Sequence, residues 1–377
     1  MKKRIYTTSV LLLASIPAFT QFKLESHLNM FRANDLIFKQ QVAYKDPGRS
    51  GENVLWDFSQ LNVVNDEYEL AYTTPNDTIV TGTEHITHYH YVLQDDHLVL
   101  LGFENPTTQL RNIQPEVLLK FPFHHGDTVG SYYYAHGHYG NRLEMDVMGI
   151  TQTIGDAYGM LILPNKDTLK SVLRTRTIKH IAETTVPIAD AYFEKLEFPL
   201  IIFPDSIEKR LAADSILFIV ETFRWYEKGY RYPVFETVRS WDLYRHSREH
   251  PFFNTAFFYP PQDHHYLNDD VENLIILENK MKGKDKKPDP WEGLTYNIYP
   301  NPVHTEPLQI EIYLPKSTNV RIQLSKVTGQ AVLNVNKGNY PPGICHFEVD
   351  LSHLPEDNYS LTIGLSDKTI KEIVMKR

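Results

Sequence analysis

Short runs of alternating or continuous apolar residues, rich in Tyr, Phe, Val, Ile and Thr, recur along residues 21–278. Turn signals of Gly, Asn, Asp and Pro separate these runs, so neighbouring runs can pair as antiparallel hairpins. The pattern predicts an all-β fold with a large antiparallel body, either a sandwich or an open barrel. A doubly wound α/β fold is not expected, because it needs helices that alternate with strands. The predicted strands include residues 68–73, 87–93, 97–103, 143–150, 171–181 and 216–225.

Helical spacing of apolar residues is confined to short segments, chiefly residues 29–41 and 189–198. We expect a short helix in each, because apolar residues recur there every three or four positions.

Residues 279–294 have a different composition from the body, with several lysines interleaved with Gly283, Pro288 and Pro290. Such a stretch buries little apolar surface, so it predicts a linker. An ordered surface loop is the alternative.

Beyond the linker, residues 295–377 alternate apolar and polar positions over about six short runs. This alternation predicts a small Ig-like β-sandwich, because one face of each strand is apolar. Cys345 shares its apolar face with Phe347 and Val349, so we expect a buried core residue rather than a reactive thiol.

The C-terminal unit also resembles a known family through an ordered set of motifs. They are Tyr299-Pro300-Asn301-Pro302 before the first strands, Gly329 in a hairpin, Tyr359 in the penultimate strand, and a basic end at Lys376-Arg377. In this order, at the end of the chain, they are similar to the A-type C-terminal sorting domain of type IX secretion cargo in Bacteroidetes. The family usually has Gly where this chain has Asp357, although Asp and Asn tolerate left-handed backbone better than most residues.

The resemblance implies that residues from about 295 to 377 engage the type IX secretion machinery. It further implies transport across the outer membrane to the cell surface or the medium, and it leaves open whether the domain is then removed. The body resembles uncharacterised β-rich cargo of the same group, which implies no particular activity.

The N-terminus carries Lys2, Lys3 and Arg4, followed by an apolar run over residues 9–19. This run is too short to span a bilayer and predicts a signal peptide over residues 1–20, with Gln21 as the first mature residue. A buried N-terminal helix is the alternative. We therefore expect an exported chain that passes through the periplasm, with no transmembrane segment in its mature part.

Charge and cysteine content narrow the possible partners and chemistry. The 377 residues include 47 acidic and 38 basic side chains, for a formal net charge of -9. A nucleic-acid partner is not expected, because phosphate recognition depends on clustered Lys and Arg. The single cysteine permits neither an internal disulfide nor a cysteine-based zinc site.

Catalytic motifs are missing from the sequence of the body. It has no Gly-x-Ser-x-Gly elbow, and the one cysteine lies in the C-terminal unit. His88 and His90 would point the same way on a strand, which makes them candidate metal ligands. Two imidazoles do not complete a site, and a polar strand surface is the alternative. We predict no catalytic residue, no metal and no cofactor.

The segment over residues 223–237 concentrates aromatic and charged side chains around Gly229. Its Trp225, Tyr226, Tyr230 and Tyr232 are candidate ligand-binding residues, because aromatic rings with polar edges suit sugars. Core or cross-strand packing is the competing interpretation, and it is the one that we favour.

Five Asp-Ser/Thr-apolar triplets resemble the acceptor of O-glycosylation in exported Bacteroidetes proteins. The alternative is an ordinary turn that leads into a strand. The candidate acceptors are Thr78, Thr128, Thr168, Ser206 and Ser215.

Taken together, the sequence predicts an exported cell-surface or secreted protein with a β-rich binding body and a type IX sorting domain. We expect its ligand to be a glycan or a protein. The alternative is a secreted, glycosidase-like hydrolase that uses a carboxylate pair in the body, since such pairs have no short signature.

Overall fold

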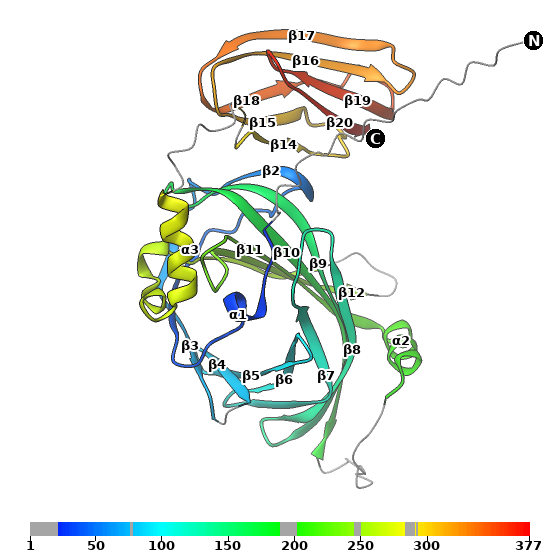
Figure 1. Cartoon of the computed structure of the whole chain (residues 1–377). Coiled ribbons are helices and arrows are strands. Elements are labelled where there is room, and N and C mark those ends of the chain that lie inside the picture. Colours follow the sequence, from blue (N-terminus) through cyan, green and yellow to red (C-terminus); the bar gives the residue numbers. More distant parts are fainter. Residues whose placement is uncertain (1–21, 76–77, 189–201, 245–249, 283–290, 292) are drawn as a thin grey trace, which may run out of the picture.

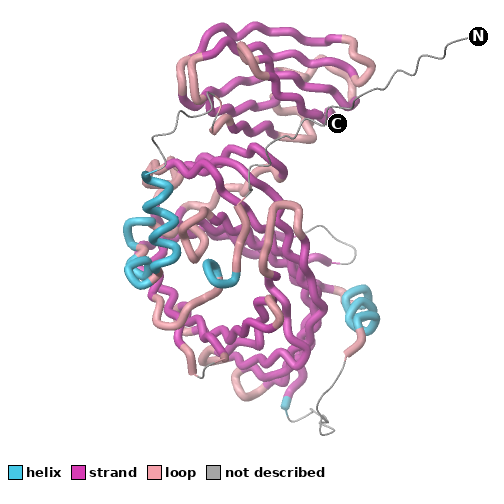
Figure 2. Tube along the Cα trace, in the orientation of Figure 1, coloured by secondary structure: helices cyan, strands magenta, loops and turns pink. Residues whose placement is uncertain are grey.

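The computed structural model describes residues 22–75, 78–188, 202–244, 250–282, 291 and 293–377. Within these ranges strands dominate, and they form a large body and a smaller C-terminal domain (Figure 1, Figure 2). The all-β prediction is confirmed.

The body is built on a long sheet. Its strands are β1 (Leu36–Val42), β2 (Gly51–Asp57), β3 (Val63–Thr73), β4 (Ile79–Glu84), β5 (Thr87–Gln94), β6 (His97–Glu104), β7 (Thr108–Lys120), β8 (Thr128–Tyr139), β9 (Leu143–Ile162), β10 (Thr168–Pro187), β11 (Ile216–Tyr226), β12 (Phe235–Tyr244) and β13 (His250–Phe258). The sheet is antiparallel except at β2, which runs parallel to β9.

The sheet closes on itself. Its strands follow the order β10-β11-β12-β13-β1-β3-β4-β5-β6-β7-β8-β9, and β9 also pairs with β10. The β9–β10 hairpin is the longest pairing, because both strands have 20 residues and pair from end to end. Among the described residues, the body is therefore a closed barrel of twelve strands, where the sequence suggested a sandwich or an open barrel.

Short helices accompany the barrel (Figure 1). The helix α1 (Ser26–Asn29) lies inside the ring of strands, whereas α2 (Pro204–Ala213) packs outside on β8, β9 and β10. After β13 come the 3-10 helices η2 (Pro261–Asp263) and η3 (His265–Asp269), and then α3 (Val271–Lys282).

The helix expected over residues 29–41 is wrong, because α1 ends at Asn29 and β1 begins at Leu36. Pairing of β1 with both β3 and β13 fixes this segment as a strand, so tertiary contacts override its helical spacing. The helix predicted over residues 189–198 lies outside the described residues. The start of the predicted linker, residues 279–282, belongs to α3.

The C-terminal domain has seven strands within the described residues. They are β14 (Thr295–Tyr299), β15 (Leu308–Leu314), β16 (Thr318–Lys326), β17 (Ala331–Tyr340), β18 (Gly343–Val349), β19 (Asp357–Gly364) and β20 (Thr369–Lys376).

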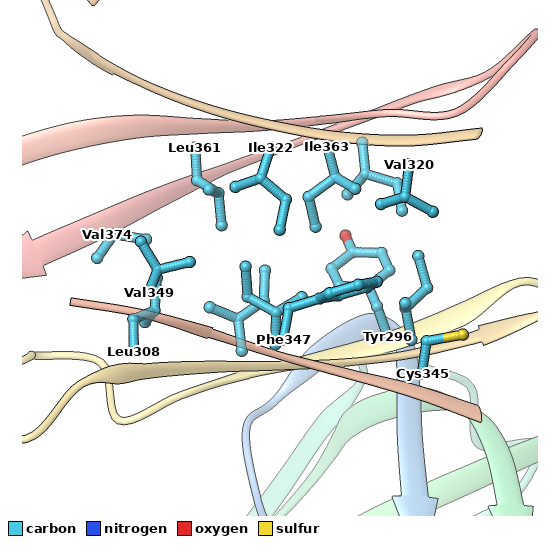
Figure 3. Close-up of a cluster of buried hydrophobic side chains, with 14 of the residues drawn as sticks. Tyr296, Leu308, Val320, Ile322, Cys345, Phe347, Val349, Leu361, Ile363 and Val374 are labelled. Atoms are coloured by element: carbon cyan, nitrogen blue, oxygen red, sulfur yellow. The ribbon is translucent and has the colours of Figure 1, made fainter. Parts of the chain in front are cut away.

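These strands form two layers, β14-β15-β18 and β17-β16-β19-β20, whose apolar side chains meet between them (Figure 3). Cys345 is 8 % exposed and packs in this core with Phe347 and Val349, as the alternation predicted. Trp291 and Leu294 are buried in the same core, so the packed unit begins within the predicted linker.

The two parts are joined through β2. This strand runs parallel to β9 on one side and to β14 on the other, where Tyr296 pairs with Val54. Leu55, Met160 and Ile162 of the body form an apolar cluster that packs against side chains of the C-terminal domain. One sheet therefore continues from the body into the C-terminal domain.

Candidate functional site

The residues just after α1 contact strand side chains that point into the barrel, and these contacts identify its interior face. Phe31, just after α1, stacks on Tyr72 of β3 with ring centroids 4.7 Å apart, and it contacts Tyr91 of β5 at 4.8 Å. Burial raises the pKa of Tyr91, and the nearby guanidinium of Arg224 on β11 opposes this rise. Since β5 and β11 are far apart in the strand order, Tyr91 and Arg224 face each other across the interior.

Ion pairs line this interior face. Arg224 Nε lies 2.5 Å from Glu236 Oε2, and the two residues are direct partners on β11 and β12. Lys39 Nζ lies 2.6 Å from Glu84 Oε1 and 4.1 Å from the centre of the Phe257 ring. A third pair joins Lys179 Nζ to Glu116 Oε1 at 2.6 Å. Each of these carboxylates is thus matched by a cation.

Several side chains that point into the barrel are partly exposed to solvent. The Arg224 side chain is 40 % exposed and that of Glu84 is 29 % exposed, although both point into the barrel. Tyr89, Tyr91 and Tyr226 are half-buried on the same face. The middle of the barrel therefore offers accessible charged and aromatic groups, instead of a continuous apolar core.

The electrostatics keep Glu236 ionised and Tyr226 protonated at neutral pH. Burial would raise the pKa of Glu236, but attraction to Arg224 and Lys39 outweighs burial and holds that pKa below its usual value. Burial raises the pKa of Tyr226 to about 12, against the opposing charge of Arg224. At Glu236 and Tyr226 the site therefore presents a carboxylate and a protonated phenol.

Apolar and polar contacts border this region along the barrel. Toward the start of β9, a cluster that includes Tyr133 and Met145 fills the interior. Toward the other end, Leu24 pairs with Phe123, and Asn29 donates a hydrogen bond to the carbonyl of Arg231. The N-terminal segment is thus part of the wall of the site.

The four aromatic candidates do not form one surface. Trp225 is fully buried and faces away from the interior, packed against residues of β2 and β12. Tyr232 is also buried and donates a hydrogen bond to Asp35 at 2.8 Å. Tyr230 packs on the cluster around Trp225, and Tyr226 faces the interior. Trp225 and Tyr232 are thus packed within the fold, whereas Tyr226 belongs to the interior site.

The two candidate metal ligands share the outer face of β5. His90 Nδ1 is 3.0 Å from the hydroxyl of Thr81, and His88 Nδ1 is 2.9 Å from that of Thr83, so each imidazole bonds a cross-strand partner. Among the residues that the structure describes, no group of three or more His, Cys, Asp or Glu side chains is placed to hold a metal ion.

The motif residues of the C-terminal domain hold its first loop to its last strand. Asn301 donates a hydrogen bond to the carbonyl of Ile373 at 2.9 Å and accepts one from the amide of Met375 at 2.8 Å. The peptide bonds Tyr299–Pro300 and Asn301–Pro302 are cis.

Three further motif residues shape the domain. Tyr299 ends β14 and donates a hydrogen bond to Glu311 at 2.7 Å. Gly329 has φ +91° in the β16–β17 hairpin, and the buried Tyr359 bonds the carbonyl of Pro355 at 2.8 Å. Asp357 is the first residue of β19, and its backbone is not left-handed. This position therefore does not require the Gly that the family usually has.

The hydroxyl-bearing residues of all five predicted O-glycosylation triplets are exposed. Four of them lie in turns or at the starts of strands, whereas Ser206 lies in α2.

Residues 297–376 match the family model of the secretion system C-terminal sorting domain. The C-terminal domain is thus a type IX secretion sorting domain, as the motif resemblance implied. This domain implies export of the chain out of the cell as cargo of that system. A search of curated proteins finds no match to the chain. None of the described helices has the length and apolar character needed to cross a membrane.

Proposed function

We propose that the chain is a cell-surface or secreted binding protein whose body binds a glycan. The observation that carries this proposal is the exposure of Arg224, which is 40 % exposed although it lies among Glu236, Tyr91 and Tyr226 inside the barrel. Concave sites lined by aromatic rings with a few polar groups are typical of small-ligand binding. A protein ligand fits less well, because protein partners usually bind broad outer surfaces.

The hydrolase alternative gains no support from the interior carboxylates. Glu84, Glu116 and Glu236 are each paired with a cation, and the pKa of Glu236 lies below its usual value as described above. A general acid for glycoside cleavage needs a raised pKa. Binding without bond cleavage therefore accounts better for this chemistry.

The proposal is tested by incubating the purified mature chain, residues 21–377, with an array of immobilised glycans. The complete mature chain is preferable to the isolated body, because β2 of the body pairs with β14 of the sorting domain. Residues 291–377, which have their own apolar core, provide the control for binding by the sorting domain alone. We expect binding to specific glycans by the full chain and not by the control. A signal no higher than the control on every glycan would contradict the proposed function.

A further inference from the structure

The charges inside the barrel compensate one another. Lys39 pairs with Glu84, Lys179 with Glu116, and Arg224 with Glu236. An anionic or cationic ligand would meet counter-charges that are already engaged, and it would also lose its hydration. A hydroxyl group fits better, since it is uncharged and can accept from the partly exposed cation of Arg224 or donate to the partly exposed carboxylate of Glu84.

The aromatic groups add a second requirement. Tyr89, Tyr91 and Tyr226 line the same accessible region and are half-buried. Each presents a flat apolar ring with a hydroxyl at its edge, and burial keeps the phenols of Tyr91 and Tyr226 protonated by raising their pKa. A ligand that matches them has an apolar ring face surrounded by hydroxyl groups.

We infer that the interior of the barrel binds a neutral saccharide, with Arg224 contacting its hydroxyl groups and Tyr91 and Tyr226 contacting its ring. This inference rests on the proposed binding function and adds the position of the site and the charge class of the ligand. Arg224 is the central contact, because its side chain is 40 % exposed whereas that of Lys39 is 2 % exposed. Its planar group can donate to a ligand while it stays paired with Glu236.

The chain offers a matched control for Arg224 on the opposite face of the sheet. Arg176 of β10 is 38 % exposed and pairs with Glu221, a buried carboxylate on the neighbouring strand β11. Since Arg176 is the register partner of Phe223, next to Arg224 in the chain, its side chain points to the outer face. The two arginines thus share exposure and pairing but differ in the face that they occupy.

The test compares the native chain with Arg224→Lys and Arg176→Lys on an array of neutral, acidic and basic oligosaccharides, followed by titration calorimetry with the best binder. We expect neutral oligosaccharides to be bound, Arg224→Lys to weaken binding about tenfold or more, and Arg176→Lys to leave it unchanged. Thermal unfolding of each variant checks the fold. Tyr226→Leu, which removes the aromatic ring and keeps an apolar side chain, provides a second interior variant if Arg224→Lys fails to fold, and we expect it to weaken binding as well.

The outcomes separate the inference from the proposed function. Binding of neutral sugars with equal affinity in the interior and outer variants would overturn the position of the site and leave a binding protein. Selective binding of charged glycans would overturn the ligand class. Failure of the native chain to bind any glycan on the array would overturn the proposed function and, with it, this inference.

Discussion

Arg49, in the loop before β2, lies over the ring of Tyr296 in β14, with its guanidinium carbon 4.6 Å from the ring centroid. The same guanidinium donates a hydrogen bond to the carbonyl of Tyr296 at 3.1 Å. The hydroxyl of Tyr296 in turn donates to Glu372 of β20 at 2.5 Å. These contacts connect the body to both layers of the sorting domain, so the sorting domain is docked on the cargo that it exports.

Replacing Arg49 with Ala should loosen this joint. The loss of one cation-π contact and one hydrogen bond predicts destabilisation of about 1 kcal/mol. Hydrogen exchange measured by mass spectrometry should become faster in β2 and β14, with little change in β5 or β6. The exposed Arg111 of β7, replaced with Ala, serves as the control. Unchanged exchange in β2 and β14 would show that Arg49 contributes nothing to the joint.

The turn at Gly229 should not accept a side chain. Gly229 has φ +94°, and a Cβ there would lie 2.7 Å from atoms of Leu277 in α3. Gly126 has a similar φ of +88° with nothing within 4 Å of its Cβ position, so Gly126→Ala isolates the backbone cost. We expect a loss in the free energy of unfolding of about 1 kcal/mol for Gly126→Ala and about 2–3 kcal/mol for Gly229→Ala. Equal losses in urea titrations would contradict the predicted clash.

The ion pair between Asp270 and Arg231 should make stability depend on acid pH. Burial would raise the pKa of Asp270, but hydrogen bonds from Arg231 and Asn273 lower it below its ordinary value. A carboxyl with a lowered folded-state pKa stabilises the protein above its unfolded pKa of about 3.9, and this contribution is lost as the pH falls through the folded value. Asp270→Asn should therefore cost about 3 kcal/mol at pH 7.

Denaturant unfolding of the native chain and of Asp270→Asn at several pH values provides the measurement. The difference in stability between them should shrink as the pH falls below about 4, because protonation removes the charge that the variant lacks. A difference that stays constant from pH 7 to pH 3 would show that the ionised form of Asp270 is not what stabilises the fold.

The exposed glycosylation candidates predict extra mass on the exported chain. Chain purified from its native host should be heavier than its sequence by whole sugar units. Replacing all five hydroxyl-bearing residues with Ala should remove that mass, and intact-mass spectrometry measures both effects. A native mass equal to that of the unmodified mature sequence would rule out the modification. The residues concerned are Thr78, Thr128, Thr168, Ser206 and Ser215.

The alternation of apolar residues was sufficient to predict the strands and the core of the sorting domain. Cys345 and Tyr359 are buried as expected, because short hairpins determine which face of each strand is covered. The same alternation predicts that the side chains of Arg224 and Trp225 point to opposite faces of the sheet. It does not predict which of the two side chains points into the barrel. That depends on the pairing of β9 with β10, which closes the barrel through long-range contacts.

The sequence did not predict the interior site, because this site also depends on long-range contacts. Its charged groups come from segments far apart in the chain, such as Lys39 of β1 and Glu84 of β4, and no short motif connects them. The available signal was a charged residue between large apolar residues of a strand, as at Arg224 between Phe223 and Trp225. The sheet at β11 and β12 has two faces. Buried aromatic residues such as Trp225 lie on the face that β2 covers, whereas Arg224 and Glu236 lie on the face that points into the barrel.

The central claim is that the sorting domain carries a folded binding body out of the cell. The most direct measurement follows the native chain and a chain that ends at residue 294 in the native host, with quantification in the periplasm, at the cell surface and in the medium. Protease resistance of the shortened chain in the periplasm verifies that its body is folded. We predict that the native chain leaves the cell and that the shortened chain stays in the periplasm. Equal amounts of both chains outside the cell would contradict the account.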